Sequence, residues 1–133
     1  MQKIPFSDDG SQEEQLINRY PHVTYQTMEG FGGAITDSAA YVYSLMDDSQ
    51  KQQLMEAYFG ADAMRYRFVR IPIDSCDFSL SHYEADGEEA DEKLEHFSFE
   101  RVEQYILPML QDAQKAFGGK LNIMPTSWSP PAY

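Results

Sequence analysis

The sequence contains little cysteine, little positive charge and no long apolar run, and each shortage excludes a class of protein. Its one cysteine, Cys76, excludes an internal disulfide. No apolar run approaches the roughly 20 residues that span a bilayer, so no membrane span is expected. Residues 1–15 lack the basic stretch followed by an apolar one that a secretory signal would have. These shortages predict a cytoplasmic protein.

Acidic residues outnumber basic ones by 22 to 10, which gives a formal net charge of -12. A field of this sign would repel nucleic-acid phosphates and anionic membranes, so neither is an expected partner. The hydrophobic content of 42% is nevertheless enough to build a core. Residues 1–16 are polar and aperiodic, and we predict that they form a mobile lead-in to an ordered domain over residues 17–133.

Strand-like and helix-like segments alternate along this domain. Apolar and β-branched content predicts strands, and apolar residues three and four apart predict helices. The predicted strands are 23–28, 67–73 and 120–126, and the predicted helices are 38–46, 47–60 and 98–117. Pro108 should bend or divide the third helix, which ends at Gly118 and Gly119. The alternation predicts an α/β fold with a parallel sheet, although three strands alone would leave such a sheet poorly covered.

The glycine-rich segment GFGGAITD, residues 30–37, lies between a predicted strand and a predicted helix. A dinucleotide-binding loop would need glycine where the chain has Ile35, and a P-loop would need Gly-Lys followed by Ser or Thr. Both nucleotide-binding motifs are therefore excluded. Two interpretations stay open: the glycines let two backbones approach closely, or the segment places the Asp37 carboxylate at the rim where barrel enzymes hold reactive groups.

Arg70 and Trp128 are two further candidate site residues. Arg70 lies in an apolar strand, where an arginine is costly to bury without a carboxylate partner. Its partner would form either a structural ion pair or an active-site carboxylate that the arginine keeps ionised. Trp128 is the only tryptophan, and Pro130 and Pro131 stiffen its loop. It is either a core residue or an aromatic surface for a sugar ring.

The sequence predicts neither a metal site nor a cofactor. A calcium loop with Gly87 as its sixth residue would place His82 first and Lys93 twelfth, where carboxylates are required. The group Asp74, Cys76, Asp77 and His82 is a weak metal-ligand pattern, and Cys76 is better explained as a small buried residue. The acidic stretch between residues 77 and 96 is predicted to be a long loop that is either a solvated surface or the rim of a site.

Three segments together resemble glycoside hydrolase family 30, which includes glucosylceramidases. They are GFGGAITD at 30–37, RIPIDSCDFS at 70–79 and SWSPPAY at 127–133. The resemblance runs from about Val23 to Tyr133 and implies a (β/α)8 TIM barrel. This chain would form its first three βα units, with an N-terminal strand that belongs to an attached β-domain. The implied reaction is retaining hydrolysis of β-linked glycosides.

The resemblance also implies roles for individual residues. Asp37, Trp128 and Tyr133 would bind the sugar at the cleavage point, and Arg70 would support the nucleophilic glutamate. Retaining hydrolysis needs two carboxyl groups about 5–5.5 Å apart. Both catalytic glutamates would lie beyond Tyr133, so the chain is expected to be inactive alone and to require the remainder of the barrel. The alternatives are a non-catalytic module that binds carbohydrate or complements another chain, and a small acidic α/β protein of unrelated function.

Overall fold

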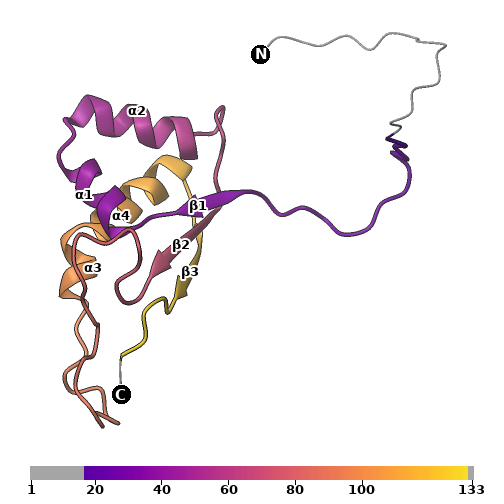
Figure 1. Cartoon of the computed structure of the whole chain (residues 1–133). Helices are drawn as coiled ribbons and strands as arrows, with labels where there is room; N and C mark the ends of the chain where they lie inside the picture. Colours follow the sequence, from indigo (N-terminus) through magenta and orange to yellow (C-terminus); the bar gives the residue numbers. More distant parts are fainter. Residues whose placement is uncertain (1–16, 132–133) are drawn as a thin grey trace.

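The computed structural model describes residues 17–131, in which helices cover one face of a parallel sheet (Figure 1). The elements run in chain order β1 (Gly32–Ala34), α1 (Asp37–Ser44), α2 (Asp48–Phe59), β2 (Phe68–Pro72), α3 (Glu100–Gln104), α4 (Ile106–Phe117) and β3 (Asn122–Thr126). β2 lies between β1 and β3, and both pairs are parallel. The predicted α/β class is confirmed. The lead-in 1–16 and Tyr133 lie outside the described residues.

The register of the sheet decides which side chains face the helices. Val69 pairs with Gly33 and Ile123, and Arg70 pairs with Ala34 and Met124. Successive side chains of a strand point to opposite faces. Val69 is buried in the core beneath the helices, so Arg70 lies on the face that the described helices leave open.

The core fills the space between the helices and the covered face of the sheet. α4 is central to it, because it contacts both α1 and α2. Its apolar positions three and four residues apart form one buried stripe, as the periodicity predicts. The largest contributors are Ile35, Tyr43, Met55, Phe59, Val69, Ile106, Leu110 and Leu121. The Tyr43 hydroxyl also donates a hydrogen bond to Asp112 of α4 (2.7 Å), and burial raises the pKa of this hydroxyl above its ordinary value.

Local hydrogen bonds fix the ends of two helices. At the start of α2, the Asp47 carboxylate accepts from the Gln50 backbone N–H (2.8 Å), and the Gln50 side chain accepts from the Asp47 N–H (3.0 Å). α4 ends at Gly118, whose φ of 73° lies in the left-handed region that favours glycine. Both boundaries confirm the sequence predictions.

The predicted strand at 23–28 is wrong. Within the described residues this segment is exposed and pairs with no strand, and the first strand begins only at Gly32. Apolar and β-branched content makes a strand only where a neighbouring backbone supplies hydrogen bonds. The third predicted helix is divided as expected, but at Tyr105 rather than at Pro108. Pro108 lies in the first turn of α4, where a missing N–H costs nothing.

The glycine-rich segment is explained by close approach of two strands. A Cβ atom at Gly32 would lie 1.9 Å from the Phe68 carbonyl oxygen, so β1 and β2 can approach only if this residue is glycine. The first interpretation of this segment is therefore confirmed. Within residues 17–131, no helix is both long and apolar enough to cross a membrane.

We predict that Gly32→Ala destabilises the chain by about 2–3 kcal/mol, because the added methyl group forces β1 away from β2. Gly119→Ala is the matched control, since its Cβ would meet only the Phe117 ring at 3.7 Å. Urea unfolding followed by circular dichroism measures both variants. Equal free energies of unfolding for the two would show that β1 does not need this close approach.

Candidate functional site

A cavity of about 310 Å³ opens at the carboxyl ends of the three strands. Its lining residues are Ala34, Thr36, Arg70, Pro72, Cys76, Phe78 and Trp128. They come from the end of β1, from β2 and the loop after it, and from the loop after β3. Enzymes with parallel barrels place their reactive groups at this end of the sheet. The cavity is therefore the candidate site.

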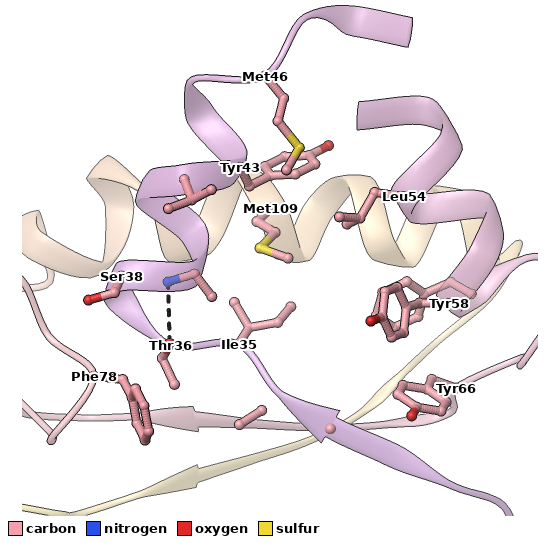
Figure 2. Close-up of a pocket in the computed structure, with 15 residues that line it drawn as sticks. Ile35, Thr36, Ser38, Tyr43, Met46, Leu54, Tyr58, Tyr66, Phe78 and Met109 are labelled. Carbon is pink, nitrogen blue, oxygen red and sulfur yellow. Dashed lines mark hydrogen bonds between the residues drawn. The ribbon is translucent and has the colours of Figure 1, made fainter. Parts of the chain in front are cut away.

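A larger cavity of about 640 Å³ lies between the helices and β1 (Figure 2). Leu54 of α2, Met109 of α4 and Met46 of the link between α1 and α2 converge on it, and no charged side chain lines it. Sugar sites need placed polar groups as well as apolar surface. The larger cavity therefore belongs to the packing between the helices and the sheet.

Arg70 and Trp128 meet at the strand-end cavity. The guanidinium carbon of Arg70 lies 4.1 Å from the centre of the Trp128 ring, a cation–π contact. The Arg70 Nε also donates to the Thr126 Oγ1 atom (2.9 Å) on the neighbouring strand. The salt bridges among residues 17–131 do not include Arg70. The expected carboxylate partner of Arg70 is thus not found within this part of the chain.

Trp128 is 44% exposed, so it is not a core residue of the described chain. Its indole Nε1 donates to the Asp77 Oδ1 atom (3.2 Å). Asp77 is therefore a site residue that the sequence analysis considered only as a weak metal ligand. Within the described residues, no group of three histidine, cysteine, aspartate or glutamate side chains is arranged to hold a metal ion.

Asp37 lies beside this cavity but not in its lining. It is the first residue of α1 and is fully buried, and its Oδ2 atom accepts from Arg101 Nη2 (2.9 Å) and from the Leu80 N–H (3.0 Å). The structure therefore brings Arg70 and Trp128 together and places Asp37 beneath the loop that contains Phe78 and Leu80.

The surroundings of Asp37 contain unusual polar chemistry. Among the described residues, Asp37 Oδ1, Arg101 Nε and the Tyr83 hydroxyl are all buried and without a hydrogen-bond partner. Burial, with a further contribution from the Asp37 charge, raises the pKa of Tyr83 to about 12. The Tyr83 hydroxyl therefore stays protonated at neutral pH and keeps its proton available for donation.

The acidic loop after β2 is held by its own hydrogen bonds. The Asp74 carboxylate accepts from the Ala85 N–H (2.8 Å), and the Asp91 carboxylate accepts from the His96 N–H (2.7 Å). The backbone hydrogen bond from His96 is the main cause that holds the pKa of Asp91 below its usual value. The loop is thus a folded border at the carboxyl end of β2 and not a free acidic tail.

The cavity has the features of a binding surface more than those of a complete catalytic centre. It combines a cation, an aromatic ring and apolar walls, which suit the apolar face of a sugar ring and a neighbouring carboxylate of the protein. None of its described lining residues is a carboxylate. These residues alone therefore cannot supply the pair of carboxyl groups that retaining hydrolysis needs.

Comparison with known proteins gives one family. The glycosyl hydrolase family 30 TIM-barrel domain matches residues 28–133. The crystal structure of SrfJ from Salmonella typhimurium is 36% identical, with a TM-score of 0.74 over 80% of this chain. The structure of the endo-β1,6-glucanase BT3312 is 31% identical, with a TM-score of 0.74 over 84% of this chain. The lysosomal acid glucosylceramidase of Mus musculus is 27% identical over 89% of this chain.

The chain is much shorter than these relatives. It covers 24% of the SrfJ and BT3312 chains and 23% of the mouse glucosylceramidase. The matching part is the amino-terminal portion of a TIM barrel, as the three parallel strands and their helices indicate. Three strands are present, and helices follow two of them within the described residues. The family match and the shared fold together show that this chain belongs to glycosyl hydrolase family 30.

Proposed function

We propose that this chain forms the first strands of the catalytic barrel of a retaining β-glycosidase and supplies one wall of its substrate site. The observation that carries the proposal is the contact of Arg70 with Trp128 at the strand ends of a chain that belongs to this family. The substrate class is β-linked glucosides. The names of the relatives, a glucosylceramidase and an endo-β1,6-glucanase, support that class.

In this proposal Trp128 presents an aromatic surface to the apolar face of a sugar ring. Arg70 stands next to it with a guanidinium that no described carboxylate neutralises. A carboxylate brought to this cavity would be held ionised by that charge, which is the state a nucleophile requires. Arg70 is therefore a supporting residue for a nucleophilic glutamate that another part of the barrel supplies.

The open face of the sheet supports a role for the remainder of the barrel. Phe68 and Met124 lie on this face and are 36% and 57% exposed. Parallel sheets are normally covered on both faces, and the inward side chains of a closed barrel form a packed core. The proposed partner is the rest of the barrel, which would cover this face and contribute both catalytic carboxyl groups.

Asp37 is proposed to contact sugar hydroxyls through its free Oδ1 atom. In the structure the loop that carries Phe78 and Leu80 covers this carboxylate, since Leu80 donates to Oδ2 and the Phe78 carbonyl accepts from the Ser38 N–H (2.9 Å). A sugar would reach Asp37 only after this loop shifts. Arg101 would hold the carboxylate through its Oδ2 atom in both arrangements.

We predict that the purified 133-residue chain does not hydrolyse 4-nitrophenyl β-glucoside above the rate in buffer, because its cavity lining contains no carboxylate. The release of nitrophenolate, measured by absorbance, checks this. The proposal would be contradicted if the chain hydrolysed this substrate and if both Trp128→Ala and Asp37→Ala abolished the hydrolysis. The chain would then contain its own catalytic groups.

A double-mutant cycle distinguishes a sugar contact of Asp37 from the contribution that its ion pair with Arg101 makes to stability. Asp37→Asn leaves the Arg101 charge without a partner, and we expect a loss of about 2–3 kcal/mol in the free energy of unfolding. Arg101→Met combined with Asp37→Asn should recover at least about 1 kcal/mol of that loss in urea unfolding.

Binding of methyl β-glucoside, followed by Trp128 fluorescence, completes this test. The double variant should remain impaired in binding even though its stability has recovered. Recovery of both stability and binding would show that Asp37 is a structural residue with no sugar contact.

A further inference from the structure

Three buried polar atoms lie beside the ion pair of Asp37 with Arg101, and none of them has a hydrogen-bond partner among the described residues. They are Asp37 Oδ1, Arg101 Nε and the Tyr83 hydroxyl. We propose that these three atoms bind one internal water molecule, which joins the start of α1, α3 and the loop after β2. This inference does not rest on the proposed function, because it concerns the arrangement in which the loop covers Asp37 and requires no sugar.

The three side chains come from different segments and meet in one place. The Arg101 Nη2 atom donates to Asp37 Oδ2 (2.9 Å), and the guanidinium carbon of Arg101 lies 5.6 Å from the centre of the Tyr83 ring. Burial is the main cause of the raised pKa of Tyr83, and the Asp37 charge is the next, which places the carboxylate close to the phenol. Arg101 is therefore adjacent to both the carboxylate and the phenol.

The ion pair uses only half of the arginine fork. A guanidinium can donate from Nε and Nη2 to the two oxygens of one carboxylate, which gives two parallel hydrogen bonds. Here the Arg101 Nη2 bond to Asp37 Oδ2 is present, whereas Nε and Oδ1 do not bond to each other. The Oδ2 atom is already shared with the Leu80 N–H (3.0 Å). The second half of the fork therefore needs a molecule that accepts from Nε and donates to Oδ1.

Water is the ligand that fits these requirements. A carboxylate oxygen only accepts, the Nε of arginine only donates, and a phenol hydroxyl does both. A water molecule can accept from Arg101, donate to Asp37 and form its third hydrogen bond with Tyr83, and three bonds are typical of buried water. An ion fits less well, because the charges of Asp37 and Arg101 already neutralise each other. A cation would meet the guanidinium, and an anion would meet the carboxylate.

This water completes a junction that holds the loop after β2. The Leu80 N–H donates to the Asp37 carboxylate, and the Ser75 N–H donates to the Tyr83 carbonyl (3.0 Å), so the loop backbone is bound on both sides of the cluster. A buried polar group without a partner destabilises the folded arrangement, and the bridging water removes that penalty for all three atoms. Loss of the bridge should let the loop open more often without unfolding the helices.

The first experiment detects the water directly by nuclear magnetic resonance of the isotope-labelled chain. The Arg101 Nε–H proton reports on the molecule that accepts from it. We expect a rotating-frame Overhauser contact between this proton and water, with the sign opposite to that of proton exchange with solvent. An Arg101 Nε–H proton without this contact would overturn the proposal, whatever the behaviour of the variants.

The second experiment removes one ligand of the water. Tyr83→Phe keeps the ring beside Arg101 and deletes only the hydroxyl. We expect the Leu80 amide, which donates to Asp37, to exchange its hydrogen about fivefold faster, the effect of losing one hydrogen bond. Tyr105→Phe is the matched control and should keep the parent exchange rate. Its ring lies 5.9 Å from the Arg101 guanidinium carbon, while its hydroxyl accepts from the exposed side of the chain.

Unchanged or slower exchange of the Leu80 amide in Tyr83→Phe would overturn the proposal, because deletion of an unpaired buried hydroxyl is neutral or stabilising. Faster exchange in a chain whose Arg101 proton has no water contact would also overturn it, since the phenol would then bond to the carboxylate directly. Should Tyr83→Phe lose its helical circular dichroism signal, the water contact of the parent chain would decide the proposal alone.

Discussion

The parallel pairing of β2 with β3 is the constraint on which the candidate site depends. In this register Pro72 lies opposite Thr126, so the side chain of Arg70 can reach the Thr126 hydroxyl and then the ring of Trp128. A shift of one residue would move Arg70 to the face that the helices cover, where its charge would be buried among apolar side chains. The close contact of β1 with β2 at Gly32 extends the same sheet to the third wall of the cavity.

A second layer of contacts joins the loops to this sheet. The buried pair of Asp37 with Arg101 links the start of α1 to α3, and the Leu80 N–H adds the loop after β2 to the same carboxylate. These bonds hold the loop from which Phe78 lines the cavity. The strands therefore form the floor of the candidate site, and the buried Asp37 carboxylate holds the loop that borders it.

Local sequence patterns predicted most of the elements, because helices and buried strands are coded by residues close to one another. The helices at 38–46 and 47–60 and the strands at 67–73 and 120–126 agree with the structure to within two residues at each end. The prediction of a strand at 23–28 was wrong because no strand of the described residues pairs with this segment, whatever its β propensity. Motif reasoning also named Arg70 and Trp128, which the structure brings together.

The remaining site contacts depend on residues far apart in the sequence. The bond from Trp128 to Asp77 joins residues 51 positions apart, and the pair of Asp37 with Arg101 joins residues 64 apart. No periodicity or spacing rule reports such contacts, since they arise only once the parallel strands are in register. For this reason the burial of Asp37 was not predicted, although its place near the carboxyl end of a strand was.

The central claim is that this chain forms a working wall of a glycosidase site. The most direct test replaces the matching segment of the endo-β1,6-glucanase BT3312 with residues 28–133 of this chain and measures hydrolysis of β-1,6-glucan. The account predicts that the folded chimera hydrolyses the glucan and that Arg70→Met and Trp128→Ala each reduce the rate at least about tenfold. A folded chimera whose rate is the same with and without these two substitutions would contradict it.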